Sequence, residues 1–269
     1  MKEFFKKAYK FSNSWTGTII IVLFVIFFIA QAFRIPSGSM KDSLLIGDHL
    51  FAKKFAYGIA MPHIPFLEIS IMPWSDKLRL MDGDRPERGD VVIFRYPKNP
   101  QQHFVKRCVA LPGDELFVAN KHLFIHFKEG DEWIKEHYKD FEIAVYDQKL
   151  WVKNPYMKEH PGIHHDDKII NDGHYPAPVF FVKPLKVAED EYFMMGDNRD
   201  HSNDSRFWGA VPYENIEGTP WFVYFSIDEN WEIRWDRVGK TPTDLEAPYH
   251  LEKAIEERKR TDKEYYGIT

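Results

Sequence analysis

The chain has almost no cysteine, because Cys108 is the only one among its 269 residues. An intrachain disulfide is therefore excluded, and the fold must be stabilised by packing even in an oxidising compartment. A single cysteine in a strand-like segment could act as a nucleophilic thiol, but we expect Cys108 to be a small, buried, apolar side chain.

The chain also lacks a net positive charge, because 41 acidic residues outnumber 36 Lys and Arg and leave a formal charge of -5. Binding along nucleic acid then has no electrostatic support, and no nucleic-acid partner is expected. A His-rich stretch has the composition of a metal site but no known zinc spacing, so we expect a polar loop there, and neither a metal nor another cofactor. Its residues are His160, His164, His165 and His174, with Asp166 and Asp167.

Aromatic residues, in contrast, make up 16% of the chain, and Val, Ile and Phe concentrate in short runs. Such runs favour strands over helices, so most of the chain is expected to be β. Strands are predicted at residues 48–57, 90–96, 104–111, 179–187 and 192–195, and hairpins at 116–127 (around Asn120-Lys121) and 221–238.

An apolar run without charged residues covers residues 11–33. About 20 apolar residues cross the hydrocarbon of a bilayer, so the run predicts a transmembrane helix. The preceding lysines place residues 1–10 in the cytoplasm and the rest of the chain across the membrane; they are Lys2, Lys6, Lys7 and Lys10, against the single Glu3. The alternative is a cleavable signal peptide, because Ala30-Gln31-Ala32 is a small-x-small sequence, but we expect the run to be retained as an anchor.

Two stretches interrupt the strand pattern. Residues 58–84 are too apolar for an ordinary loop and are expected either to pack on the core or to lie in the membrane interface. Residues 128–178 are charged and His-rich, and the family resemblance described below implies that they form an insertion. Residues 251–266 predict a solvent-exposed helix, to which we assign no function.

The predicted division of the chain has five parts. Residues 1–10 are cytoplasmic and residues 11–33 are transmembrane. Residues 34–127 and 179–239 form the core, residues 128–178 are the insertion, and residues 240–269 are a linker and a charged tail.

Several short sequence motifs occur in an order and at spacings that are informative together. Ser39 lies in Pro36-Ser37-Gly38-Ser39-Met40, directly after the apolar run, and Lys106-Arg107 lies in a predicted strand. Residues 196–209 read GDNRDHSNDSRFWG, and Arg88-Gly89-Asp90-Val91-Val92 and Leu111-Pro112-Gly113-Asp114 flank the lysine. Over residues 35–218 this pattern resembles the catalytic boxes of type I (bacterial) signal peptidases, membrane-bound serine/lysine proteases that remove signal peptides from exported proteins.

The resemblance implies an antiparallel β-sheet catalytic domain, with an inserted second β-rich subdomain, behind an N-terminal transmembrane helix. It also implies a serine endopeptidase that cuts exported preproteins after a small-x-small site such as Ala-x-Ala. We expect a single-pass monomer in contact with the lipid of the bacterial inner membrane, with its catalytic domain on the periplasmic side.

Ser39 and Lys106 can act as nucleophile and base only under a strict electrostatic condition. A serine hydroxyl is a poor nucleophile until a base takes its proton, and Lys106 can be that base only if its pKa falls by roughly three units, about 4 kcal/mol. An apolar pocket is therefore required. The resemblance implies the following roles: Ser39 as nucleophile, Lys106 as general base, Ser37 Oγ and Ser39 N–H as oxyanion hole, Ser202 orienting the lysine, Asp204 and Arg206 as a supporting ion pair, and Phe94, Phe104 and Met194 as pocket walls.

Two observations leave alternatives open. The chain has Asp42-Ser43 where the family usually has Pro-Thr, which removes the restraint of the proline and adds a negative charge near Ser39. His103 could also serve as the base, oriented by Asp204, because its facing along a strand does not by itself exclude it.

Two other functions remain as alternatives to the signal peptidase reading. One is a self-processing serine/lysine peptidase, against which the anchor argues. The other is an anchored periplasmic binding domain without activity, against which the joint presence of Ser39, Lys106 and Ser202 argues.

Overall fold

The computed structural model describes residues 2–64, 69–72, 74 and 79–266, so part of the apolar stretch at 58–84 lies outside the described residues. Antiparallel sheets dominate, which confirms the predicted mostly β fold. The larger sheet has the order β1 (Ala30–Arg34), β2 (Asp48–Lys53), β16 (Ile216–Ser226), β7 (Val91–Tyr96), β8 (Asn99–Ala110), β14 (Glu191–Met195) and β15 (Val211–Pro212).

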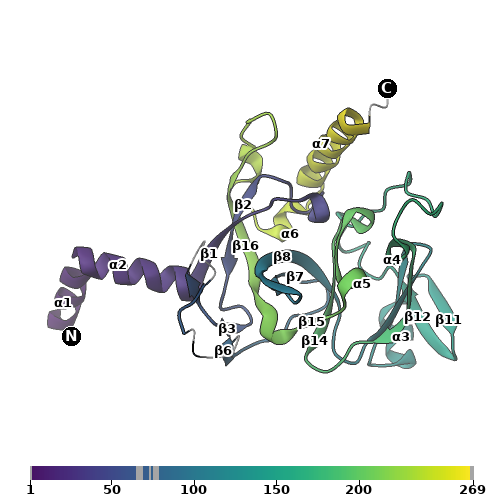
Figure 1. The fold of residues 1–269 in the computed structure, drawn as a ribbon, viewed down its shortest axis with the longest axis horizontal. Helices are drawn as coiled ribbons and strands as arrows, with labels where there is room; N and C mark the ends of the chain where they lie inside the picture. The colour runs from purple at the N-terminus through teal and green to yellow at the C-terminus, as the bar shows by residue number, and fades with distance from the viewer. Residues whose placement is uncertain (1, 65–68, 73, 75–78, 267–269) are drawn as a thin grey trace.

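A second sheet lies beside it, on the right in Figure 1. Its order is β11 (Ile143–Tyr146), β12 (Lys149–Lys153), β10 (His122–His126), β9 (Glu115–Ala119) and β13 (Phe181–Lys186). The predicted insertion at 128–178 therefore supplies only β11 and β12, and the flanking segments supply the other three strands. Two small ribbons join β3 (Gly58–Ala60) to β6 (Arg79–Asp82) and β4 (His63–Ile64) to β5 (Ile69–Ser70).

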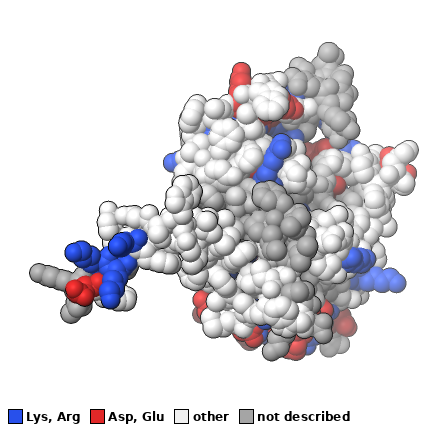
Figure 2. Space-filling view, turned by 60° about the vertical axis from the view of Figure 1, so that its left-hand side comes forward, with Lys and Arg blue, Asp and Glu red and all other residues white. Residues whose placement is uncertain are grey.

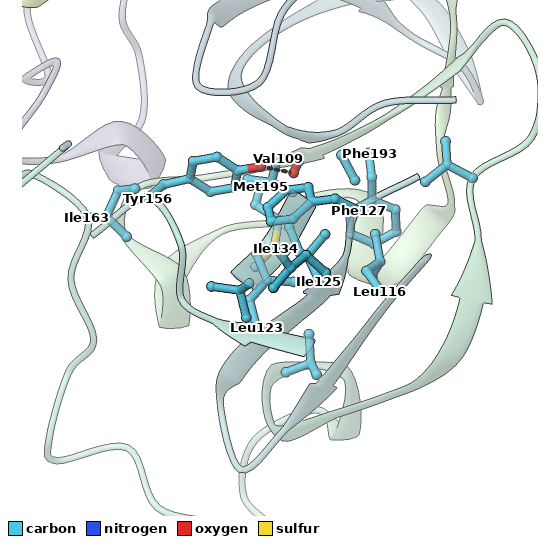
Figure 3. Close-up of a cluster of buried hydrophobic side chains, with 14 residues drawn as sticks. Val109, Leu116, Leu123, Ile125, Phe127, Ile134, Tyr156, Ile163, Phe193 and Met195 are labelled. Carbon is cyan, nitrogen blue, oxygen red and sulfur yellow. Dashed lines mark hydrogen bonds between the residues drawn. The ribbon is translucent and has the colours of Figure 1, made fainter. Parts of the chain in front are cut away.

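The predicted hairpin of β9 and β10 is confirmed. Asn120 and Lys121 both have positive φ, 45° and 73°, as a two-residue hairpin turn requires. Alternate residues of the two strands are buried, and Leu116, Leu123 and Ile125 point into one apolar cluster (Figure 3).

The same cluster joins the two sheets. Val109 of β8 and Met195 of β14 pack in it, and the Tyr156 hydroxyl donates a 2.6 Å hydrogen bond to Val109 O (Figure 3). Because β8 and β14 also carry residues of the site described below, the shared core fixes the second sheet relative to that site.

The helices of the N-terminal part differ from the prediction. Helix α1 (Lys2–Ser12) precedes α2 (Trp15–Phe24), which continues as a π-helical turn, Val25–Ile29; β1 then begins at Ala30, so the predicted helix at 11–33 was wrong in its last residues. In Figure 2 basic side chains gather at the tip of this segment, and the stretch that joins it to the body is uncharged. In the described part of the chain no single helix is long and apolar enough to cross a membrane; Glu3–Ser12 and Trp15–Ile29 qualify only together, bent by 86°.

The C-terminal part required two corrections. The predicted hairpin at 221–238 was wrong, because after β16 only one bridge, between Ile227 and Ile233, continues the pairing. Buried Arg237 instead bonds the Asp48 carboxylate at 2.7 and 3.0 Å, which draws the returning segment across the end of the sheet. The predicted helix at 251–266 is present as α7 (Pro248–Tyr266), but it is docked on the body, with Ala254 buried, rather than solvent-exposed.

The remaining helices are short. They are α3 (Asp131–His137), α4 (Ala177–Phe180), α5 (Ser205–Trp208) and α6 (Pro242–Leu245), with 3₁₀ turns at Gly38–Met40 (η2), Arg199–His201 (η3), Tyr213–Asn215 (η4) and Trp235–Arg237 (η5).

The position of β1 predicts the fate of the Ala30-Gln31-Ala32 sequence. These residues pair in register with β2, opposite Lys53, Ala52 and Phe51. A cut after Ala32 would remove most of an edge strand, so we expect the mature protein to keep its N-terminal segment. Intact-mass measurement and N-terminal sequencing of the membrane-extracted protein test this, and a mature N-terminus at Phe33 would contradict it.

Candidate active site

The turn that carries Ser39 connects β1 to β2. Ser39 lies in the 3₁₀ turn η2, and the next residues continue it, because Leu44 N donates to Met40 O at 2.7 Å. Met40 and Leu44 are fully buried in the core beneath the larger sheet. The serine is thus held by apolar anchors on its C-terminal side.

Lys106, in the middle of β8, meets this turn. Its Nζ lies 2.6 Å from Ser39 Oγ and 3.0 Å from Val105 O. The two residues are 4% and 9% exposed, so the pair is nearly excluded from water. The structure therefore brings together the two residues that the sequence analysis placed at the centre of the chemistry.

The face of β8 that carries Lys106 is apolar. Residues opposite each other in an antiparallel pair share a face, and the register pairs Phe94 with Phe104 and Met194 with Cys108. Both Phe94 and Met194 are fully buried, and the Phe104 ring centroid lies 5.3 Å from Lys106 Nζ. All three predicted wall residues thus lie on the side of the lysine.

Burial in this wall lowers the pKa of Lys106 from 10.5 to about 8. Asp204 and Asp197 act against the shift, and Arg206 adds to it. Desolvation disfavours the ammonium form, so about a tenth of the amine is neutral at pH 7 and about half at pH 8. A neutral amine 2.6 Å from a hydroxyl can accept its proton.

The candidate oxyanion donors lie beside the pair. Ser37 is exposed in the same cleft, and Ser39 occupies the first turn of a 3₁₀ helix, where N–H groups have no intrahelical acceptor. Two donors next to the hydroxyl are the arrangement that a developing oxyanion needs.

Ser202 lies on the other side of the turn that carries Ser39. A Cβ on Gly196 would come within 2.3 Å of Ser202 Oγ and 2.5 Å of Ser39 O, so only glycine fits between them. Ser202 Oγ is buried and, among the described residues, has no hydrogen-bond partner of standard geometry. Its expected role in orienting Lys106 stays a prediction.

The loop at 196–209 braces the site with charges and amides. Asn198 donates from Nδ2 to Gly38 O at 3.0 Å and from its backbone N–H to Ser39 O at 3.1 Å. Asp204 and Arg206 form a buried two-bond ion pair, both at 2.8 Å, as the resemblance implied. Burial opposes ionisation of Asp204, but Arg206 outweighs it and lowers the pKa of the carboxyl.

A second buried pair lies on the opposite face of β8. Arg107 donates to Asp197 at 2.8 and 2.7 Å and also contacts Glu246, and Ser43 Oγ donates to Asp197 at 2.5 Å. Glu246 in turn lies 2.8 Å from His160 Nδ1. The network links β8 to the turn that carries Ser39, to the insertion and to the segment before α7.

Cys108 and His103, the other candidate nucleophile and base, differ in their access to this site. Cys108 is fully buried in the apolar wall, where burial raises the pKa of its thiol, so the predicted structural role fits it. His103 Nε2 lies 3.0 Å from Glu217 Oε2, and His103 also lines the cleft that contains Ser39 and Lys106.

A cleft of about 1010 Å³ runs over Ser39. Its walls include residues 33–41, residues 103–106, part of the His-rich stretch at 164–168, and Arg258 and Lys259 of α7. The histidines pair with carboxylates, as His165 does with Asp200 at 3.2 Å. Within the ranges that the structure describes, no group of three or more His, Cys, Asp or Glu is arranged to hold a metal.

The contribution of α7 to this cleft is not predicted by the sequence. The helix is charged along its length, which is typical of a solvent-exposed surface helix, and nothing in its own sequence marks the partners that dock it. The only signal was Asp42, an unusual charge next to the nucleophile that required a partner.

Comparison with known proteins gives a consistent result. Residues 9–225 match the family described as Signal peptidase, peptidase S26. The signal peptidase I of Helicobacter pylori (strain J99) is 41% identical, over 94% of this chain and 99% of the relative. That of Pseudomonas fluorescens is 35% identical, over 82% and 73%, and that of Aquifex aeolicus is 34% identical, over 77% and 80%. A crystal structure of a signal peptidase I from Enterococcus faecalis V583 is 23% identical with a TM-score of 0.31, over 51% of this chain and 97% of that one.

The buried pair of Arg107 and Asp197 predicts a stability effect. Asp197→Asn leaves a guanidinium that is 1% exposed without its two-bond partner, so we expect the free energy of unfolding to fall by about 3 kcal/mol. Arg107 lowers the pKa of Asp197 against the effect of burial, so this stabilisation is complete above pH 4 and is lost as the pH falls through the folded-state value.

Urea unfolding of the detergent-solubilised protein at pH 7 measures this change. The control is Glu132→Gln, which removes an 89% exposed partner of Lys135 and should change the free energy by less than about 0.5 kcal/mol. A similar small change in both variants would refute the structural role of Asp197.

Proposed function

Because this chain belongs to the signal peptidase family, peptidase S26, we propose that Ser39 and Lys106 are the nucleophile and general base of its reaction. It is a serine endopeptidase of the signal peptidase I type, and its reaction is the removal of signal peptides from preproteins. The observation that carries the assignment of roles is the 2.6 Å contact of Lys106 Nζ with Ser39 Oγ behind an apolar wall.

In the proposed reaction, neutral Lys106 takes the proton of Ser39 as its Oγ attacks the scissile carbonyl. Ser37 Oγ and the Ser39 N–H donate to the oxyanion. The Lys106 ammonium then gives its proton to the departing amine of the mature protein, which leaves the signal peptide as an ester on Ser39. Lys106 next deprotonates a water molecule, which attacks the ester, and the proton returns to Ser39 Oγ.

The proposal includes the location of the enzyme. The N-terminal helices are its membrane anchor, with the lysines of α1 on the cytoplasmic side and the sheets across the membrane. Exported preproteins with a small-x-small site are its substrates, membrane lipid is its second partner, and it acts as a monomer. The exposed lysines at the tip of the anchor in Figure 2 support this orientation.

Substitution of the serines tests the nucleophile. Ser39→Ala should abolish cleavage of a preprotein with an Ala-x-Ala site, with unchanged thermal unfolding. Ser37→Ala should lower kcat by about 10²-fold or more, the usual loss for one oxyanion donor. Mass spectrometry of the products gives both the rate and the cut, and full activity in Ser39→Ala would rule out the serine mechanism.

Dependence on pH tests the base. Only the neutral amine of Lys106 accepts a proton, so kcat/KM should rise with pH and level off above the lysine pKa of about 8. Lys106→Arg should be inactive because guanidinium stays protonated, and His103→Ala should stay within about twofold of the wild-type rate. Near-normal turnover in Lys106→Arg, together with collapse in His103→Ala, would assign the base to histidine.

A further inference from the structure

Asp42 follows the nucleophile by one turn and is held in an uncommon state. Its φ is +79°, in the left-handed region that aspartate tolerates better than most residues, and it is 1% exposed. A carboxylate that is removed from water costs several kcal/mol unless a charge or hydrogen bonds compensate it. The stability of this turn therefore depends on the partners of Asp42.

The cationic partner comes from the far end of the chain. Arg258 Nη1, in α7, lies 2.8 Å from Asp42 Oδ2. His164 Nδ1 lies 3.2 Å from the same oxygen, but it is closer, at 2.9 Å, to Gly162 O. Burial lowers the pKa of His164 to about 4, so this histidine is neutral near pH 7, whereas Arg258 brings a full positive charge to Asp42.

Polar contacts dock α7 beside the turn. Lys41 Nζ donates to Thr261 Oγ1 at 3.0 Å, and Glu257 accepts from Arg234 Nε at 2.8 Å. Arg260 and Asp228 form a longer pair, at 3.5 Å, in which Arg260 is half exposed. In Figure 1 α7 stands as a separate yellow helix over the body of the molecule. Arg258 of this helix lines the cleft that contains Ser39.

We propose that Arg258 is a positioning residue for the reaction, which acts by neutralising Asp42 and so fixes the turn that holds Ser39 Oγ against Lys106. The proposal rests on the roles of Ser39 and Lys106 given above. Asp42 lies between the 3₁₀ turn and the buried Leu44 with a left-handed backbone, so the conformation of this residue affects how the turn continues. Displacement of a reacting group by about 1 Å can cost 10²-fold in rate, so a small relaxation of the turn has a large effect on catalysis.

Hydrogen exchange of the full-length protein in detergent tests the positioning directly. The amides of Ser43 and Leu44 donate to Met40 O at 3.1 and 2.7 Å, and they report on the turn. Arg258→Ala should speed their exchange about tenfold, and Arg258→Lys should restore part of the protection. Arg260→Ala is the matched control, because it removes an arginine of the same helix that faces Asp228 instead. Equal protection in Arg258→Ala and Arg260→Ala would overturn the proposal, whether or not the protein cleaves a preprotein.

Kinetics with an Ala-x-Ala preprotein test the consequence. Arg258→Ala should lower kcat about tenfold or more, with KM within about twofold and the limiting pKa of the pH profile unchanged, because the wall of Lys106 is intact. In an Asp42→Gly background glycine accepts the positive φ and no charge needs a partner, so Arg258→Ala should then cost less than about twofold. An equal loss in both backgrounds, or a rise in KM alone, would show that Arg258 contacts the substrate and would refute positioning through Asp42. Absence of any cleavage by the wild type would refute the proposed function instead, and the exchange experiment would still decide the role of Arg258.

Discussion

A lysine amine kept out of water is the interaction on which the rest of this structure depends. Removing an ammonium from water is costly, and the protein must either pair it or let it lose its proton. In β8 successive side chains point to opposite faces of the sheet, and the two faces have different surroundings. Lys106 faces Phe94, Phe104 and Met194, while its neighbour Arg107 points to the other side of the sheet and takes the carboxylates there. One strand thus separates a site for a neutral amine from a site for ion pairs.

The charges close to the lysine are arranged so that they largely cancel. Asp204 is neutralised by Arg206 and Asp197 by Arg107, and each pair is joined by two hydrogen bonds. An unpaired carboxylate at either position would draw the lysine back to its charged form. The loop that carries Asp197 and Asp204 therefore braces the turn that carries Ser39 without favouring the charged form of Lys106.

Local patterns predicted most of the strands and the hairpin turn at Asn120-Lys121. The resemblance of the sequence motifs to those of signal peptidases, rather than a local pattern, implied that Ser39 and Lys106 lie together. Two features were beyond local signals. An apolar run does not reveal where a helix gives way to a strand, as happens at Ala30. A charged helix likewise gives no sign of docking when its partners, such as Asp42 for Arg258, lie at the other end of the chain.

The direct passage from helix to strand at Ile29 and Ala30 has a mechanical consequence. A catalytic domain on a flexible linker would sample many heights above the bilayer. Here the apolar N-terminal helix runs into an edge strand of the larger sheet, and Ser39 follows that strand within a short turn. For the membrane-anchored enzyme proposed above, the depth of the serine is set by covalent geometry. Such an enzyme selects its substrate by the depth of the scissile bond. A peptide bond that lies deeper in the membrane than Ser39 can reach the serine only after the helix of the substrate unwinds.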